Sequence, residues 1–238
     1  MLKLVATFFM LIDHIGMVFF QEVIGFRMIG RLAMPLFAYS LAKGFSKTKA
    51  LGDYKKRLAI FALLSQIPYG VMSYAVYRIP ESLFRLNIGF TFLAALWVLS
   101  FYRDLKECLF RKKEDNLHKL IQIGGLGISC IALLVLTTVL QCDYGAYGIL
   151  LVLAFYEGYI CQKNPYLTSY LILGVTLLMG VGMGSSWVVM QVGGGLLGFL
   201  LVLFVKDSYL PRLKYFFYVI YPLHMLLFGL VKWMGMKN

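Results

Sequence analysis

The chain alternates between long apolar runs and short polar breaks, and this alternation restricts the folds open to it. The runs that approach the roughly 20 residues needed to cross a bilayer lie at 3–21, 28–45, 57–76, 86–103, 120–140, 145–161, 166–183, 186–205 and 214–234. Only 14% of the residues are charged, against about a quarter in soluble domains. The sequence therefore predicts an all-α, polytopic transmembrane bundle of about nine helices, within a range of roughly 8–10, that forms one domain over residues 1–238.

The lysines and arginines are distributed unevenly over the breaks between these runs. With the N-terminus placed inside, 17 of the 23 fall on the inner side and six on the outer side. Because positively charged loops tend to remain in the cytoplasm, we expect a multi-pass protein of the cell membrane with its N-terminus inside. These loops account for the net charge of +12, so no nucleic-acid partner is expected. The outer loops carry little charge, and Asp143 beside Tyr144 is the exception that makes this pair a candidate for a site.

Polar side chains interrupt several of the apolar runs. Asp13 and His14 stand side by side in the middle of FMLIDHIGMVFF, residues 9–20. The further polar residues in or at the ends of runs are Arg31, Ser65, Gln66, Arg85, Asn87 and His224. A charged group inside a span costs about 2.5–3.5 kcal/mol on insertion scales, so its default interpretation is functional. Arg27 and Arg85 lie near the outer interface, where we expect them to snorkel toward water.

Three prolines lie inside the runs, and each is within four residues of one of these polar positions. They are Pro35, Pro68 and Pro222. A proline cannot donate to the carbonyl four residues before it, and it kinks a helix. Irregular backbone at membrane depth is tolerated where it is buried in protein or lines a watery cavity. We therefore expect the first, second, third and last helices to meet around a polar pocket.

Histidine is the side chain whose proton equilibrium lies nearest to neutrality. We interpret His14 as a general base that takes a proton from a hydroxyl or amine as this group attacks an activated carbonyl, while a nearby arginine stabilises the oxyanion. Neighbours on a helix point about 100° apart, so Asp13 is expected to pair with a cation of another helix, with Arg31 as the candidate. His14 and His224 are well separated in the sequence and have no companion ligands, so no metal site is expected.

The glycines of GVGMGSSWVVMQVGGGLLG favour close helix packing over a nucleotide-binding loop, because no strand precedes them. Gly180 and Gly184 have the small-xxx-small spacing of packed transmembrane helices. Gly194 and Gly198 have the same spacing, so both pairs are expected at helix contacts.

Six segments together resemble the TraX family of membrane proteins: KLVATFFMLIDHIGMVF, RMIGRLAMPLFAYSLAKGFSKT, YKKRLAIFALLSQIPY, RLNIGFTF, DYGAYGIL and YFFYVIYPLHMLLF. The similarity runs nearly end to end and is weak around 103–135. The family is named for an acetyltransferase that modifies pilin, and it is similar in turn to the wider transmembrane acyltransferase group that includes the acyltransferase 3 family. The positions that match its blocks are Asp13, His14, Arg31, Pro35, Ser65, Gln66, Pro68, Asn87, Asp143, Tyr144, Tyr221, Pro222 and His224.

The resemblance implies an integral membrane acetyltransferase. It would take the acetyl group from cytosolic acetyl-CoA and pass it to a hydroxyl or amine of an acceptor in or across the bilayer, where the acceptor is a glycan, lipid, peptide or small molecule. His14 would act as the general base, with Asp13 and Arg31 orienting it or balancing charge. The expected pocket residues are Ser65, Gln66, Asn87, Asp143, Tyr144, Tyr221 and His224. The basic inner loops would attract the phosphates of CoA.

A small-molecule or proton-coupled transporter is the alternative, because a polar pocket with broken helices and intramembrane charges also suits passage of a solute. Many transporters are built from internal repeats, and no repeat is visible in this sequence. A non-catalytic membrane scaffold is the third hypothesis, but it gives no reason for an aspartate and a histidine inside a span.

Overall fold

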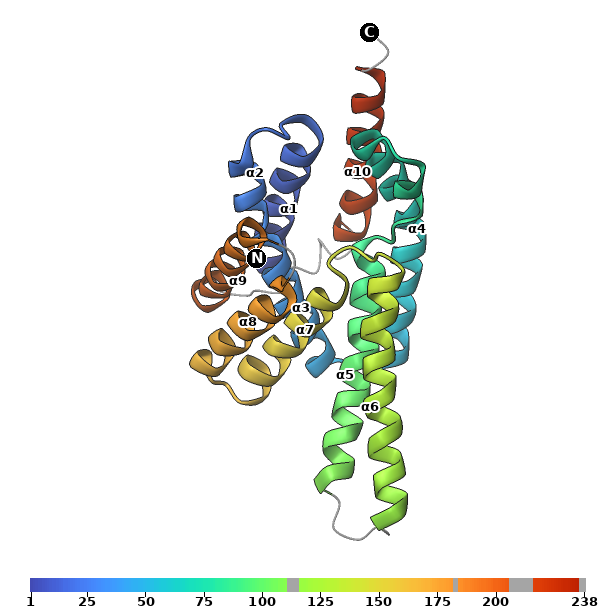
Figure 1. The fold of residues 1–238 in the computed structure, drawn as a ribbon, viewed down its shortest axis with the longest axis vertical. Coiled ribbons are helices and arrows are strands. Elements are labelled where there is room, and N and C mark those ends of the chain that lie inside the picture. The colour runs from blue at the N-terminus through green and yellow to red at the C-terminus, as the bar shows by residue number, and fades with distance from the viewer. Residues whose placement is uncertain (111–115, 182–183, 206–215, 236–238) are drawn as a thin grey trace.

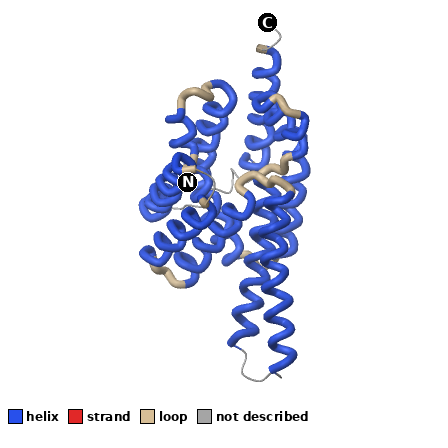
Figure 2. Tube along the Cα trace, in the orientation of Figure 1, coloured by secondary structure: helices blue, strands red, loops and turns tan. Residues whose placement is uncertain are grey.

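In the computed structural model, every regular element of the described chain is a helix. The structure describes residues 1–110, 116–181, 184–205 and 216–235. The elements are α1 (Leu2–Phe19), α2 (Ile24–Gly30), α3 (Ala33–Lys47), α4 (Leu51–Tyr77), the 3₁₀-helix η1 (Pro80–Phe84), α5 (Ile88–Phe110), α6 (Asn116–Val139), α7 (Gly145–Ala154), the π-helix η2 (Phe155–Cys161), α8 (Pro165–Gly180), α9 (Ser185–Phe204) and α10 (Phe216–Met234). Figure 2 shows helices and loops but no strand in these ranges, so the predicted all-α class is confirmed.

The helices follow the predicted apolar runs. The second run is divided, because α2 ends at Gly30 and α3 begins at Ala33, and the sixth run continues from α7 into η2. Within the described residues, six helices are long and apolar enough to cross a membrane: α1, α4, α5, α6, α9 and α10. This is the pattern of a multi-pass membrane protein.

The three intramembrane prolines differ in their effect on the backbone. Pro35 is the third residue of α3, a position whose N–H has no partner within the helix, so it begins a new helix and does not kink an existing one. By contrast, α4 continues through Pro68 and α10 continues through Pro222. The second run is interrupted only at Arg31 and Leu32, which form a turn with right-handed helical backbone angles between α2 and α3.

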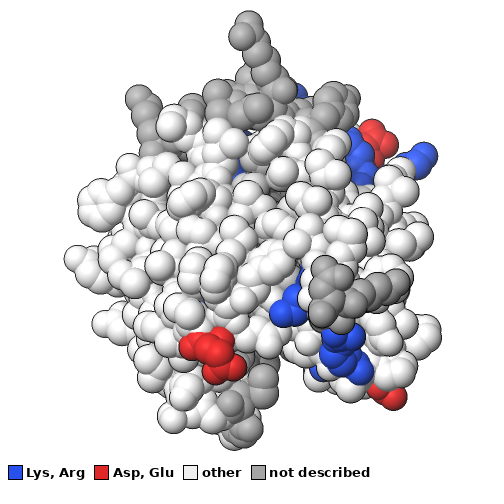
Figure 3. Space-filling view, turned by 90° about the horizontal axis from the view of Figure 1, so that it is seen from above, with Lys and Arg blue, Asp and Glu red and all other residues white. Residues whose placement is uncertain are grey.

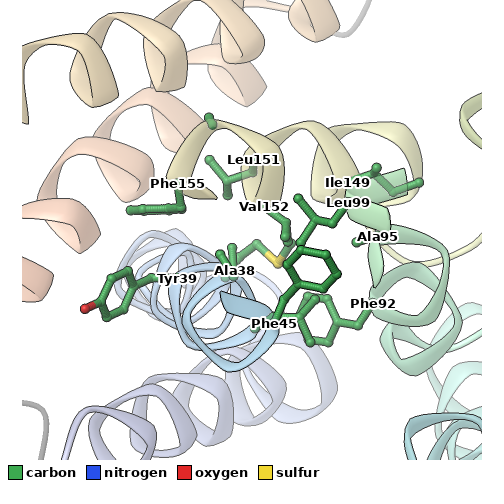
Figure 4. Packing of buried hydrophobic residues seen from close by; sticks show 14 of the residues in the cluster. Ala38, Tyr39, Phe45, Phe92, Ala95, Leu99, Ile149, Leu151, Val152 and Phe155 are labelled. Carbon is green, nitrogen blue, oxygen red and sulfur yellow. The ribbon is translucent and has the colours of Figure 1, made fainter. Parts of the chain in front are cut away.

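Two apolar cores hold the bundle together. In the larger core, side chains of α3 such as Ala38 and Phe45 lie between Phe92 of α5 and Val152 of α7 (Figure 4). The smaller core joins α1, α3, α4 and α10 through Met10, Val18, Ala33, Met72, Tyr221 and Met225. Together the two cores fix the helices that carry the predicted site.

The outer surface is largely apolar. Leu64 and Ile67 of α4 are 70% and 76% exposed, and Phe204 of α9 is 82% exposed. Figure 1 shows α5 and α6 as a long pair that extends beyond the other helices, and only 6% of the apolar window of α6 is buried. Figure 3 shows a face with few charged side chains. So much exposed apolar surface is unfavourable in water and suits a lipid bilayer.

Candidate functional site

A cavity of about 860 Å³ lies between α1, α3, α4 and α10, within the size range of ligand-binding pockets. One end is lined by Lys47 of α3 and Arg57 of α4, the middle by His14 of α1, and the other end by Ser73 and Tyr77 of α4. Arg57 and Tyr77 are separated by about 30 Å of helix at 1.5 Å per residue, which is close to the thickness of a bilayer core. The cavity therefore follows most of one spanning helix.

The structure brings together predicted residues that are far apart in the sequence. Those that line the cavity are Asp13, His14, Arg31, Asp143, Tyr144 and Tyr221. The turn between α6 and α7 carries Asp143 and Tyr144 to the side of α1 and α2. His224 stands behind His14, is 4% exposed, and is not part of the cavity wall.

The two intramembrane histidines are in direct contact. Nδ1 of His14 lies 2.6 Å from Nε2 of His224, and the two rings are stacked with an interplanar angle of 18°. On its other side, Nδ1 of His224 lies 2.7 Å from the carbonyl oxygen of Ile220. Their positions in the first and last apolar runs predicted a catalytic pair at similar depth, but the 210 residues between them gave no signal for a direct contact of the rings.

Asp13 pairs with Arg27, which corrects the prediction that named Arg31. Nη1 of Arg27 donates to Oδ2 of Asp13 at 2.9 Å, and Asp13 is 8% exposed. Arg27 was expected to snorkel toward water, but here its guanidinium points into the bundle. The charge of Asp13 is therefore balanced within the α1–α2 hairpin.

Close packing of α2 on α1 explains this choice of partner. A Cβ atom at Gly30 would overlap the side chain of Asp13, so the two helices touch at this level. Arg27 and Arg31 are four residues apart, which places them on one face of a helical segment. This spacing was the available signal that either arginine could reach Asp13.

Arg31 contacts the α6–α7 turn. Its Nη1 donates to the hydroxyl of Tyr144 at 2.7 Å. Nε of Arg31 and Oδ1 of Asp13 are buried and have no hydrogen-bond partner among the described residues. Two strongly polar atoms, one donor and one acceptor, thus remain unpaired near the cavity wall.

Tyr144 is held in an unusual backbone conformation. Its φ is 61°, a left-handed value that is uncommon for a bulky residue and stores of order 1–3 kcal/mol. The turn is fixed to the start of α5, because Thr91 donates to the carbonyl of Asp143 at 2.6 Å and the N–H of Asp143 donates to Leu86 at 2.8 Å. Burial raises the pKa of the Asp143 carboxyl to about 6, although Arg31 opposes this shift.

Glycines of α9 determine where the α2–α3 break lies. A Cβ at Gly194 would come within 2.6 Å of the Cβ of Arg31, and one at Gly198 would overlap the ring of Pro35. The predicted packing role of this pair is confirmed. Gly180 likewise packs against Val188, whereas Gly184 has open space around it and a φ of +85°. Gly184 is therefore a turn residue and not a packing contact.

Besides His224, three predicted pocket residues lie outside the cavity wall: Ser65, Gln66 and Asn87. Asn87 Nδ2 donates to the carbonyl of Ala62 at 2.7 Å and to Oε1 of Gln66 at 2.9 Å. Gln66 Nε2 donates to the carbonyl of Arg85 at 2.7 Å. These bonds fasten the start of α5 to the middle of α4, so Gln66 and Asn87 have a structural role here. Ser65 is fully buried, and its hydroxyl has no hydrogen-bond partner among the described residues.

A cluster of basic residues surrounds one mouth of the cavity. The lining residues there include Lys3, Lys43, Lys47 and Arg57, from α1, α3 and α4. Lys3 is about 16 Å from His14 along α1 at 1.5 Å per residue. We call these four residues the basic mouth.

The arrangement can be compared with known proteins. The family model described as TraX protein matches residues 1–232. This chain belongs to the TraX family. Searches of the curated proteins and of the solved structures gave no match.

In this TraX family member, sequence reasoning missed two groups of cavity residues. Arg27 was assigned to the interface, and Tyr69 and Tyr77 were treated as ordinary aromatic residues of helix faces. Tyr69 and Tyr77 are eight residues apart on α4, which places them about 80° apart around a helix and within one stripe of a helix surface. The sequence predicted basic inner loops only as a group, and the four residues of the basic mouth are basic residues of that group that line the cavity.

Proposed function

We propose that this TraX family protein is an integral membrane acetyltransferase that moves an acetyl group from acetyl-CoA to a hydroxyl or amine. One observation carries the proposal: the same cavity connects the basic mouth to His14 and the arginines beside it. A basic entrance attracts phosphates, and a histidine next to guanidinium groups suits acyl transfer.

The basic mouth fits the donor. CoA carries several phosphates at one end of a long, flexible arm and the thioester at the other end. Phosphates held by Lys43, Lys47 and Arg57 would leave the arm to extend along the cavity toward His14. The donor supplies an activated acetyl carbon, and the remaining chemistry depends on side chains of this chain.

His14 acts as the base. It takes the proton from the acceptor hydroxyl while the acceptor oxygen forms a bond to the acetyl carbon. When the carbon–sulfur bond breaks, His14 returns this proton to the leaving sulfur, so that free CoA and an acetyl ester are produced. An amine acceptor gives an amide by the same transfer of one proton.

Arg31 stabilises the negative charge that develops on the carbonyl oxygen. Its guanidinium is oriented by the hydroxyl of Tyr144, and its Nε has no partner among the described residues. A donor fixed before the reaction needs no reorganisation as charge develops. Asp13 and Arg27 carry opposite charges and form an ion pair, so together they add no net charge to the site.

The acceptor enters from the opposite end of the cavity. That end is lined by Met17, Tyr69, Ser73 and Tyr77, which combine aromatic faces with hydroxyl groups. With the N-terminus inside, the basic mouth faces the cytosol, where the donor is found, and the acceptor end faces the other side or the lipid.

The proposal is tested with purified protein in detergent and radiolabelled acetyl-CoA. Release of free CoA should be lost in His14→Ala and in His14→Gln, because an amide cannot take the proton, while both variants keep the parent melting temperature within a few degrees. Near-normal turnover by either variant would remove His14 from the mechanism.

Donor binding has its own matched pair of variants. Lys47→Ala should weaken binding of CoA measured by calorimetry, and Lys49→Ala should not, because Lys49 is an exposed neighbour outside the cavity wall. Equal binding by both variants would contradict the assignment of the basic mouth.

A transporter remains the second candidate, because the cavity follows about 30 Å of α4 at 1.5 Å per residue. The two functions are distinguished by what is measured. A transporter moves an unchanged solute between two compartments, whereas a transferase releases free CoA even in detergent micelles, where there are no compartments. Movement of a solute in proteoliposomes with no CoA release would favour the transporter.

A further inference from the structure

The contacts of the two histidines determine where their protons lie. The carbonyl oxygen of Ile220 can only accept, so Nδ1 of His224, at 2.7 Å, must carry the hydrogen. In a neutral ring the other nitrogen is then an acceptor. Nε2 of His224 therefore accepts from Nδ1 of His14 at 2.6 Å, and the free lone pair of His14 is on Nε2.

His224 has no direct access to reactants. It is 4% exposed and does not line the cavity, whereas His14 does. Its ring is packed edge-on by Tyr221 and Phe228 at centroid distances of 5.8 and 5.5 Å. Any effect of His224 on chemistry must therefore pass through His14.

We infer that His224 is a positioning residue that fixes the reactive tautomer of His14, with Nδ1–H held and Nε2 free to act as base. The inference rests on the proposed function for its catalytic consequence, but the proton positions stand on geometry alone. In a catalytic triad, an acceptor bound to Nδ1–H of the histidine fixes the tautomer in which Nε2 is the base. His224, held by the Ile220 carbonyl, would have this role for His14.

A neutral acceptor suits this location. A carboxylate behind His14 would place a charge among Tyr221, Phe228 and Met225, where the described residues contribute aromatic and apolar packing. Imidazole accepts the same hydrogen bond without a charge. When Nε2 of His14 takes a proton, Nδ1 of His14 can pass its own proton to Nε2 of His224, which moves the positive charge away from Arg27 and Arg31 and leaves the number of protons unchanged.

Nitrogen-15 NMR tests the proton positions directly. The chain has only three histidines, so labelled histidine in nanodiscs gives few signals, and His118→Gln and His224→Phe assign them. In the parent protein, His14 should show a protonated Nδ1 and an unprotonated Nε2. A parent protein with the hydrogen of His14 on Nε2 would overturn the inference, whether or not any acetyl transfer is detected.

Two substitutions test the consequence for chemistry. His224→Phe keeps a packed ring but removes the acceptor, so His14 should change tautomer and kcat for CoA release should fall about 10²–10⁴-fold, the usual contribution of a general base, with little change in KM for acetyl-CoA. His224→Gln places an amide oxygen near the position of Nε2, and should restore the His14 tautomer and part of kcat. Equal kcat values for the parent and His224→Phe would overturn the inference. It would also be overturned if His224→Gln had a kcat as low as that of His224→Phe. If the parent shows the expected tautomer but no transfer, the acetyltransferase proposal fails and the positioning of His14 stands.

Discussion

Asp13 and Arg27 form an ion pair at 2.9 Å inside the α1–α2 hairpin, with side-chain exposures of 11% and 24%. They come from consecutive helices, so the chain makes this contact with only a short turn between the partners. The pair places a carboxylate beside the candidate base without adding net charge.

The ion pair predicts coupling between Asp13 and Arg27. Removing one partner leaves a charge unpaired in a mostly buried place, which costs about 3–5 kcal/mol in comparable pairs. Asp13→Asn and Arg27→Met should each lower the melting temperature in detergent, and the double variant should lose less than the sum. The matched cycle with Arg31→Met measures the coupling of Asp13 to the second arginine, which acts on this carboxylate without a direct hydrogen bond. Additive effects for Asp13 and Arg27 would mean that the two do not interact.

Tyr144→Phe should reduce acetyl transfer while the protein remains folded. The change removes the hydroxyl that accepts from Arg31 at 2.7 Å, and an unpaired buried donor costs about 1–3 kcal/mol. Tyr147→Phe is the control, because Tyr147 is buried nearby but does not line the cavity. The measurement is the rate of CoA release, and equal rates for the two variants would separate Tyr144 from the reaction.

Gly194→Ala should displace the α2–α3 break. Its new methyl group would lie 3.1 Å from the carbonyl carbon and oxygen of Arg31, and overpacking of this kind costs about 1–3 kcal/mol. Gly193→Ala is the neighbouring control with nothing within 4 Å, and it should be neutral or slightly stabilising because alanine favours helix. Thermal melts decide, and similar values for both variants would contradict the packing.

The buried carboxyl of Asp143 predicts a pH dependence of stability. Its pKa is raised from 3.8 to about 6, so the folded state binds this proton more tightly than the unfolded state does. The stabilisation is present below about pH 4, the usual range for an aspartate, and is lost as pH rises toward 6. Melts of the parent from pH 4 to 7 should show this loss relative to Asp143→Asn. A constant difference between the two over this range would contradict a raised pKa.

Cysteine labelling tests sidedness in a background without native cysteines. Lys49→Cys should react only from the cytoplasmic face, and Glu81→Cys only from the opposite face, because both positions are exposed at opposite ends of α4. Position 144 was predicted to label from outside, but Tyr144 faces the cavity, so Glu81 is the better probe. Labelling of Lys49→Cys from outside would reverse the topology and remove the route for a cytosolic donor.

The helices were predictable because lipid forces each spanning segment to satisfy its own backbone hydrogen bonds, so apolar runs near span length become helices. The α2–α3 break was harder to place. Pro35 indicated irregular backbone, but the start of α3 at Ala33 lies where Gly194 and Gly198 of α9 let the chain pack closely, and the sequence around Pro35 does not show that contact.

The sequence indicated which residue types belong to the site better than it indicated which residues contact each other. The cost of burying Asp13 and His14 pointed to function from the sequence alone. Which arginine reaches Asp13 depends on the depth of α2 against α1, and the His14–His224 contact joins the two ends of the chain. Such contacts arise from packing, and no local spacing encodes them. Gln66 and Asn87 show the opposite error, because polar groups at membrane depth can simply fasten two helices together.

A passage that follows one helix from Arg57 to Tyr77 has a consequence for the energy supply of a cell. Membranes hold gradients of protons and sodium, and a continuous water-filled path of this length would let these ions flow down their gradients. Arg27 and Arg31 line the middle of the path, and fixed positive charges exclude small cations from pores. Because Asp13 neutralises Arg27, Arg31 is the charge that would act in this way. If the proposed function is correct, the same guanidinium would stabilise the reaction and oppose the passage of small cations.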